Sequence, residues 1–285
     1  MASVAVRAER RRRRALRRAN PLDYSRKTWM RLMMGGVFLF LYFPIVSLVA
    51  FSFNDSKRNI TWQGFTLRYY EKALDNTQLH DAFLNSLIVA SISTSVSTIL
   101  GGMLGLALYK FRFPVQGPYE GMVHLPIVIP EICMAVAMVA FFATMDIPLG
   151  LFTITVSHIA FSIPFVAVVI RARMAGFDRS LEEASFDLGA SQWQTFWNVT
   201  FPYMKPGLVA GALLAFTLSL DDFVITFFTS GPGSTTFPIK IYSMVRFSVT
   251  PEVNAASTAL IVATLALTIT ALVIQSRAAR KSAHG

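Results

Sequence analysis

The sequence predicts an all-α polytopic membrane protein with six transmembrane helices. Hydrophobic residues make up 54% of the 285 residues and charged residues only 15%, whereas about a quarter of a soluble domain is charged. The mean hydropathy is +0.51. Six apolar stretches reach the roughly 20 residues that cross a hydrocarbon core. They cover residues 32–53, 83–108, 122–144, 149–170, 207–228 and 254–275. These observations exclude a soluble globular enzyme.

The positive charges predict the orientation of these helices. Six crossings place both termini on one side of the membrane, and 20 of the 26 Lys and Arg residues fall on that side. By the positive-inside rule this side is the cytoplasm. We therefore expect a basic cytoplasmic tail at 1–31, a transmembrane domain at 32–275 with its core at 83–275, and a cytoplasmic tail at 276–285. Because 11 of the basic residues lie in 1–31, the net charge of +10 indicates membrane topology rather than nucleic-acid binding.

The first apolar stretch and the segment after it each allow two interpretations. The run at 32–53 is 22 residues long, beyond the length of a cleavable signal sequence, so we expect it to be retained. The arginine run before it is either a solvated tail, which we favour, or a site for anionic lipid. The segment 54–82 carries four aromatic residues at spacings that suit a short amphipathic helix, either a docking surface or an aromatic belt. They are Trp62, Phe65, Tyr69 and Tyr70.

Small residues and prolines mark the inner spans. Gly101 and Gly105, and again Gly207 and Gly211, stand one helical turn apart, which favours close helix packing. Three prolines in the third and fourth spans are expected to kink them, namely Pro126, Pro130 and Pro164. Between the last two spans, "TSGPGSTTFPIK" predicts a turn or a re-entrant loop.

Four ionisable residues lie well inside the spans, and none of them is Lys or Arg: Glu131, His158, Asp221 and Asp222. A carboxylate at the centre of a membrane helix costs about 2.5–3.5 kcal/mol, so these acids need water, a partner or a cationic ligand. On one helix Asp221 and Asp222 would point about 100° apart, so we expect one to line a pathway and the other to be structural. Glu131 either lines the pathway or satisfies backbone groups freed by Pro130. His158 is interpreted as a hydrogen-bonded packing residue.

Catalytic and cofactor motifs are absent from the sequence. No phosphate-binding G-x-x-x-x-G-K-[ST] run occurs, so any ATP would be hydrolysed by another chain. Neither H-E-x-x-H nor G-x-S-x-G occurs, and Cys133 is the one cysteine. We therefore expect no enzyme activity, no catalytic residue, no metal site and no cofactor.

The predicted cytoplasmic loop at about 178–202 contains "EASFDLGASQWQTFWNVTFP", from Glu183 to Pro202. This segment resembles the EAA loop of binding-protein-dependent ABC importer permeases, with Ser185 in place of the second alanine. The resemblance implies a short coupling helix seated in a groove of the ATPase subunit, with a turn at the glycine. The residues it assigns to ATPase coupling are Glu183, Ala184, Ser185, Gly189 and Pro202.

A narrower resemblance covers nearly the whole chain. The segments "VAFSFNDS" at 49–56, "IPFVAVVIRARMAGFD" at 163–178 and "FTLSLDDFVITFFTSGPGSTTFPIK" from 216 resemble the second permease of spermidine/putrescine importers. The resemblance implies an ABC importer type I permease fold in the bacterial inner membrane and a polyamine cargo. The implied partners are a second permease subunit forming a heterodimer, two ATPase subunits, a periplasmic or extracellular substrate-binding protein and membrane lipid. Asp221 and Asp222 would lie nearest the pathway.

Two other functions stay open on the sequence. The first is an importer of the same architecture for another solute, such as an opine, an amino-acid derivative or a metal chelate. The second is a membrane anchor or sensor subunit that couples ligand binding to a cytoplasmic partner without transport.

Overall fold

The computed structural model describes residues 28–56, 61–112, 114–247 and 250–282. Within these residues the secondary structure is helical, apart from one isolated bridge between Asn54 and Phe65, so the all-α prediction is confirmed. Most of the predicted tail at 1–31 and the end of the tail at 276–285 lie outside the described residues.

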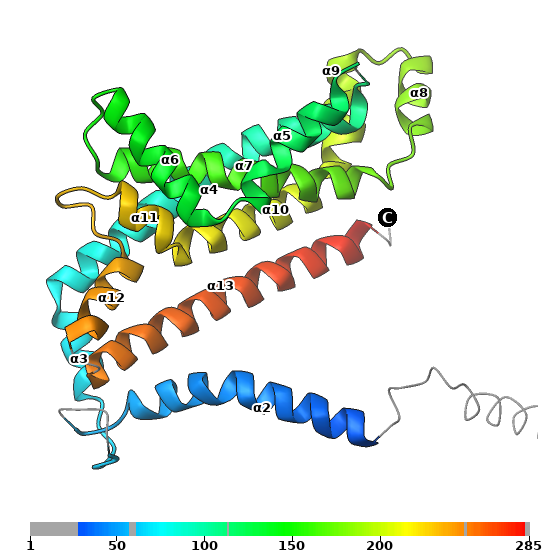
Figure 1. The fold of residues 1–285 in the computed structure, drawn as a ribbon. Coiled ribbons are helices and arrows are strands. Elements are labelled where there is room, and N and C mark those ends of the chain that lie inside the picture. The colour runs from blue at the N-terminus through cyan, green and yellow to red at the C-terminus, as the bar shows by residue number, and fades with distance from the viewer. Residues whose placement is uncertain (1–27, 57–60, 113, 248–249, 283–285) are drawn as a thin grey trace, which may run out of the picture.

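Three long helices form the centre of the fold: α4 (Thr77–Lys110), α7 (Leu151–Met174) and α10 (Phe201–Asp221) (Figure 1). Val166 and Ile170 of α7 are buried together with Met204 of α10. The predicted close packing is confirmed, because a Cβ on Gly101 would lie 2.7 Å from the carbonyl oxygen of Ile163. Small residues on α4 therefore allow α7 to approach its backbone.

The third predicted span is broken rather than kinked. Helix α5 (Gln116–Val128) and helix α6 (Glu131–Thr144) meet at an angle of 104°. Pro130 precedes α6, and the residue before it, Ile129, is extended with ψ of 134°. A residue before proline is driven out of the helical region by contact with the proline ring, so the helix ends there.

The fifth predicted span, 207–228, is also discontinuous. Helix α10 ends at Asp221, Asp222 is extended with ψ of 126°, and a short helix, α11 (Val224–Thr229), follows. The expectation that both aspartates lie on one helix is therefore wrong. Beyond α11, a turn at 230–236 leads into helix α12 (Phe237–Phe247), which the sequence analysis did not predict.

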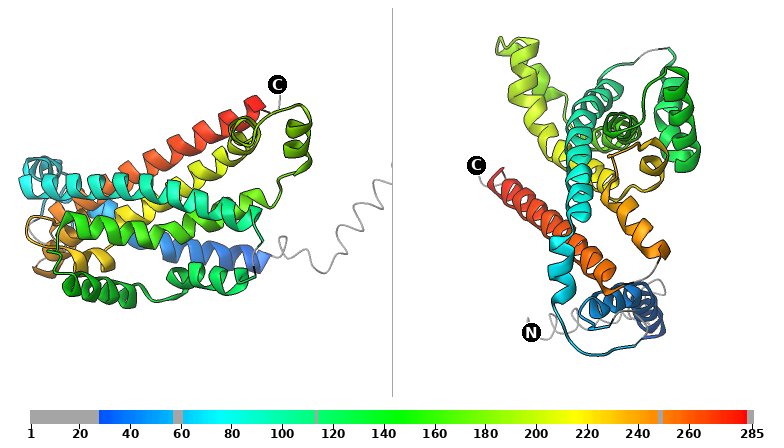
Figure 2. Two further views of the ribbon diagram at one scale, coloured as in Figure 1. Left: turned by 90° about the horizontal axis from the view of Figure 1, so that it is seen from above. Right: turned by 90° about the vertical axis from the view of Figure 1, so that its left-hand side faces the viewer.

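Helices α2 (Thr28–Phe51) and α13 (Pro251–Ser282) lie on one side of the central helices, and α5 and α6 lie on the other (Figure 1). Helix α2 has no buried residue and lies apart from α7 in Figure 1 and in the right-hand view of Figure 2. The last helix, α13, contacts α2, α10 and α12. The amphipathic helix expected in 54–82 is confirmed only in part. Helix α3 (Arg68–Asp75) carries Tyr69 and Tyr70, while Trp62 and Phe65 precede it.

Five helices are long and apolar enough to cross a membrane, or six when the bent pair α5–α6 is counted as one span. This agrees with the six predicted spans. Helices α8 (Ser180–Asp187) and α9 (Gln192–Thr195) lie at one end of the bundle, and α11 and α12 lie at the other (Figure 1). The two loops that the sequence places on opposite sides of the membrane are therefore at opposite ends of the molecule.

Candidate functional site

The two broken spans meet inside the bundle. Ala135 of α6, Phe161 of α7 and Ile225 of α11 form one buried apolar cluster, and Met134 and Val224 pack against it. The break before α6 and the break between α10 and α11 are thereby held in the same region. Non-helical backbone at membrane depth is tolerated only where protein buries it or where it lines a water-filled cavity. This region is therefore the first candidate for a solute pathway.

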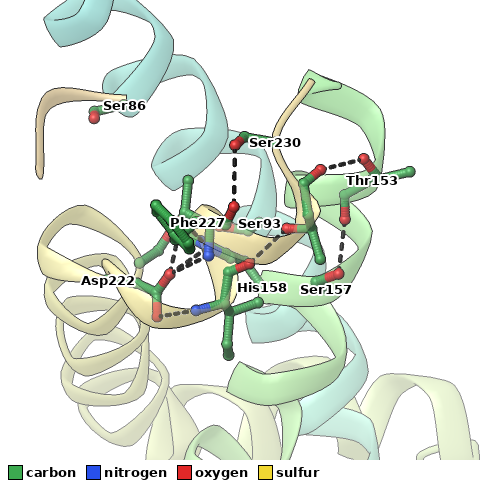
Figure 3. Close-up of polar contacts among 12 residues, drawn as sticks. Ser86, Ser93, Thr153, Ser157, His158, Asp222, Phe227 and Ser230 are labelled. Carbon is green, nitrogen blue, oxygen red and sulfur yellow. Dashed lines mark hydrogen bonds and ion pairs between the residues drawn. The ribbon is translucent and has the colours of Figure 1, made fainter. Parts of the chain in front are cut away.

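Asp222 lies within this region, and both of its carboxylate oxygens contact other protein groups. It is 8% exposed, and Oδ2 accepts hydrogen bonds from the backbone N–H and the hydroxyl of Thr226, at 2.8 and 2.7 Å. The backbone N–H of Ile225 donates to Oδ1 at 3.3 Å. The carboxylate therefore satisfies N–H groups at the start of α11 as a helix cap does. His158 of α7 lies beside it, with Nε2 at 3.2 Å from Oδ2 (Figure 3).

His158 links three helices through its two ring nitrogens. Nδ1 lies 2.7 Å from the hydroxyl of Ser219 on α10, and Nε2 lies 2.9 Å from the hydroxyl of Thr226 on α11. Ser219 is in turn 3.0 Å from the hydroxyl of Ser93 on α4. The packing role predicted for His158 is confirmed. The sequence analysis did not identify Ser93, Ser219 or Thr226, although the four-residue spacing from Asp222 to Thr226 suits a cap of α11.

Asp221 has a different environment from its neighbour. It is the last residue of α10, it is exposed, and it lines a groove of about 540 Å³ between α4, α10 and α13. Thr94 of α4 also lines this groove, and its buried hydroxyl has no hydrogen-bond partner among the described residues. Most of the other lining side chains are apolar. A carboxylate and a hydroxyl are therefore available to a ligand in an otherwise apolar groove.

Glu131 is the first residue of α6 and is exposed. The first turns of α6 pack against α11, the helix that follows Asp222, through Ala135 and Ile225. The position of Glu131 in the first turn suits a carboxylate, because the N-terminus of a helix carries partial positive charge. The two broken spans that carry the three acids singled out in the sequence therefore meet near their breaks.

An aromatic cluster follows Asp222 directly, and the sequence analysis did not identify it. The ring of Phe223 lies 4.8 Å from that of Tyr242 on α12 and 5.4 Å from that of Phe227 on α11. Phe227 is 50% exposed and Tyr242 is 46% exposed. Ring faces beside carboxylates are the usual environment in which proteins bind ammonium groups.

A second candidate site lies at the opposite end of the bundle, in α8 and α9. Helix α8 ends in a turn in which Gly189 has φ of +85°, a backbone conformation that favours glycine. The N–H of Ala190 donates to the carbonyl of Ser185, and the N–H of Gly189 donates to that of Phe186. This is a Schellman motif, and it confirms the predicted turn at Gly189.

Large apolar side chains cover the outside of this turn. Leu188 is 89% exposed and Trp193 is 69% exposed, while Leu181 and Phe186 are also exposed. Glu183 and Ala184 are exposed beside them, and Ser185 is half-buried. An exposed apolar patch of this kind is typical of a surface that contacts another protein or a membrane.

The inner side of α8 is fixed to the bundle. Glu182 pairs with Lys110 at the end of α4 at 3.1 Å and accepts a hydrogen bond from Thr200. The hydroxyl of Ser185 lies 3.0 Å from that of Thr195. A π-helical turn, Phe196–Thr200, then leads into α10, whose second residue is Pro202. Side-chain contacts therefore connect α8 to the end of α4 and to the π-helical turn that precedes α10.

Asp178 precedes α8, and hydrogen bonds from the hydroxyl and backbone N–H of Ser180 hold its pKa below its usual range.

Among the described residues, no group of three or more His, Cys, Asp or Glu side chains is arranged to hold a metal ion.

Comparison with known proteins finds a matching family and several similar permeases. Residues 97–284 match the family described as "Binding-protein-dependent transport system inner membrane component". The chain is 39% identical over 248 residues to the spermidine/putrescine transport system permease protein PotC of Escherichia coli K12, covering 86% of this chain and 94% of PotC. It is 37% identical to the putrescine transport system permease protein PotI of the same strain, covering 84% of this chain and 88% of PotI.

Solved structures give the same fold. A chain of a bacterial ABC transporter that imports the acidic polysaccharide alginate matches with a TM-score of 0.70 at 16% identity, covering 87% of this chain and 94% of that chain. A chain of the MetNI methionine ABC transporter matches with a TM-score of 0.58 at 20% identity, covering 71% and 95% of the respective chains. These structures share the architecture and differ in their cargo.

Proposed function

The chain belongs to the family of binding-protein-dependent transport system inner membrane components, and we propose that it is a permease subunit of an ATP-driven polyamine importer. It is a multi-pass protein of the inner membrane with the ABC importer permease fold. Its relatives PotC and PotI are named as permeases for spermidine and putrescine, and for putrescine. Polyamines are flexible chains that carry two or more ammonium groups, so the pathway must stabilise positive charge.

The proposal rests on the exposed carboxylates and aromatic rings that lie at the break before α6 and at the break between α10 and α11. Glu131 and Asp221 are exposed carboxylates, and Phe223, Phe227 and Tyr242 present aromatic rings beside the second break. An ammonium over a ring face gains about 0.5–2 kcal/mol, and more when it is desolvated. The spans that carry these acids contain no Lys or Arg in their interior. The passing cargo would supply the compensating positive charge.

The two adjacent aspartates have different roles in this proposal. Asp221 faces the groove and contacts the cargo. Asp222 is a positioning residue, because its oxygens are occupied by Thr226, Ile225 and His158. By capping α11 it fixes the direction of the chain after the break and so places the aromatic cluster.

The segment from Glu183 to Pro202 is the coupling element of the proposal. Its exposed side chains, led by Leu188 and Trp193, would seat in the ATPase subunit, and Glu182 would carry the movement to α4 and α10. In this arrangement the chain hydrolyses no ATP itself. A second permease would complete the pathway, and a binding protein would deliver the polyamine at the end that holds α11 and α12. Both termini would then be cytoplasmic.

Transport by the reconstituted complex tests the proposal. The chain is purified with its second permease and ATPase subunits and placed in liposomes that enclose ATP, with binding protein and labelled putrescine or spermidine outside. We expect accumulation that requires ATP, and competition by unlabelled polyamines but not by 1,4-butanediol, which has the length of putrescine without its charges. ATP-driven accumulation of another class of solute, with none of polyamine, would overturn the proposed cargo.

A further inference from the structure

Three arginines converge on a polar pocket that neither the pathway nor the coupling segment uses. The pocket has a volume of about 390 Å³ and lies between the end of α4, the start of α5 and the end of α7. Arg112, Arg171 and Arg179 line it, with Glu120 as the one acidic residue. The lining therefore carries two more positive than negative charges. The end of α4, which forms part of the pocket, lies at the same end of the bundle as α8, because Lys110 pairs with Glu182.

Two of the arginines are held in position by protein groups. Arg171 Nη1 lies 2.8 Å from Oε2 of Glu120, which leaves its other donors free for a second acceptor. Arg179 donates to the carbonyl oxygen of Tyr109 at 3.3 Å, and its guanidinium lies 5.2 Å from the centre of the Tyr109 ring. Arg112 is exposed and has no hydrogen-bond or ion-pair partner in the described part of the chain.

We propose that this pocket binds the phosphate group of an anionic phospholipid. A guanidinium matches a phosphate because its planar set of donors can contact two oxygens at once. Basic pockets between transmembrane helices on the cytoplasmic side are a recurring environment for anionic headgroups. The bound phosphate would receive donors from Arg112 and Arg171, while Arg179 adds a third positive charge.

The surroundings of the pocket favour a lipid over a free anion. Helix α5, which forms one wall, has no buried residue. On α5, Met122 is 67% exposed and Leu125 is 49% exposed, within two turns of the lining residue Glu120. Phe111 and Val115, next in the chain to the lining residues Arg112 and Gln116, are also exposed apolar side chains. A headgroup in the pocket would leave its acyl chains against this apolar wall, whereas inorganic phosphate or an acidic peptide would leave the wall uncovered.

The position gives the lipid a route to influence coupling. Arg179 directly precedes α8, and Lys110, next to the pocket on α4, is paired with Glu182 of α8. A headgroup that draws in Arg179 would hold the base of α8 against α4. Anionic lipid would then support the conformation in which α8 is fixed to the bundle.

Lipid retention by the assembled complex tests the inference. The complex of this chain with its permease and ATPase partners is titrated in detergent with phosphatidylglycerol or phosphatidylcholine, and bound lipid is counted by native mass spectrometry. We expect phosphatidylglycerol to bind more tightly than phosphatidylcholine. Arg112→Gln should lower the affinity for phosphatidylglycerol about fivefold, because one basic residue near an anionic lipid contributes about that factor to its binding. Arg112→Gln has little effect on folding, since the side chain is exposed and unpaired.

The matched control is Lys205→Gln, which removes one exposed positive charge near the start of α10, outside the pocket. It should leave phosphatidylglycerol binding unchanged. The inference would be overturned if phosphatidylglycerol bound equally well to the wild type and to Arg112→Gln. It would also be overturned if Arg112→Gln and Lys205→Gln lost phosphatidylglycerol binding to the same extent. Displacement of the lipid by low millimolar inorganic phosphate, or a crosslink from position 112 to a carboxylate of the ATPase subunit, would also overturn the lipid assignment.

Discussion

Asp221 and Asp222 are neighbours in the chain, yet α10 ends between them and gives them opposite environments. Asp221 remains exposed on the groove, while Asp222 turns inward to His158 and to the start of α11. The sequence predicted one lining and one structural residue but did not indicate which was which. The assignment depends on His158, which lies 64 positions away in the chain and meets Asp222 only when α7 packs against α11.

Asp221→Asn should reduce polyamine uptake while leaving the complex assembled. The amide keeps the size of the side chain and removes its charge. Attraction between unit charges at about 4 Å in a partly wet groove is worth about 1–4 kcal/mol, so uptake should fall about fivefold or more. Uptake of labelled putrescine, normalised to assembled complex, measures the effect. Basal ATPase activity serves as the control, and normal uptake would remove Asp221 from the pathway.

Asp222→Asn should instead reduce the stability of the assembled complex. The amide cannot accept all the hydrogen bonds that the two carboxylate oxygens accept, and it removes a charge beside His158. A buried partner left without its hydrogen bond costs about 1–3 kcal/mol. Thermal unfolding of the purified complex should therefore begin at a lower temperature than in Asp221→Asn. If the two variants unfold alike, the positioning role of Asp222 is wrong.

At the scale of elements, the chain uses glycine in two distinct ways. Gly189 supplies a left-handed conformation at the end of α8, with no neighbouring atom within 4 Å of an added Cβ. Gly105 supplies space, since a Cβ there would lie 2.6 Å from the carbonyl oxygen of Ala167. Both were visible as glycines in the sequence. Spacing indicated the packing at Gly105, and the resemblance to the EAA loop indicated the turn at Gly189.

Gly189→Val should impair coupling. A β-branched residue in the left-handed region costs about 1–2 kcal/mol or more, so the turn after α8 should shift and move the exposed apolar patch. We expect assembled complex with little polyamine-stimulated ATP hydrolysis and little uptake. Gly189→Asn is the control, because asparagine tolerates this conformation, and it should retain most activity. Wild-type coupling in Gly189→Val would contradict the role of the turn.

Gly105→Ala should destabilise the packing of α4 on α7. The added methyl group overlaps backbone, which moves only with the whole helix, and overpacking costs about 1–3 kcal/mol. Thermal unfolding of the complex measures the loss. Gly121→Ala is a matched control in α5, where nothing lies within 4 Å of the added group. Equal stability of the two variants would contradict the close approach of α4 and α7.

The break between α5 and α6 shows where reasoning from the sequence ends. Pro130 was visible and a kink was expected, but the observed angle is 104°. A proline determines that the helix is interrupted. The angle depends on contacts of α6 with α11 and α7, through Ala135, Ile225 and Phe161. Such contacts are distant in sequence and leave no local pattern.

At the scale of the whole molecule, the described part of the chain leaves much apolar surface uncovered. No residue of α2 or α5 is buried, although both helices are apolar. Lipid covers part of such a surface, and a second permease would cover the rest. The six spans predicted from hydropathy agree with the five or six helices that are long and apolar enough to cross a membrane, because every span must match the same membrane thickness. The hydropathy pattern carried little information about which faces meet a partner, because lipid and protein interfaces are both apolar.

The central claim is that the two broken spans line a water-accessible path for cations, and Cys133 allows a direct measurement. It is the one cysteine of the chain, it is exposed, and it lies two residues after Glu131 in the first turn of α6. Its modification is followed in the active complex with cysteine-free partners, using ethylammonium and ethylsulfonate methanethiosulfonates. We expect the cationic reagent to react about fivefold faster after correction for intrinsic reactivity, since acidic walls concentrate cations.

Spermidine supplied during ATP hydrolysis should slow the reaction of Cys133, and Glu131→Gln should reduce the preference for the cationic reagent. The account would be contradicted if, in a complex that transports polyamines, Cys133 reacted equally with both reagents and without protection by spermidine.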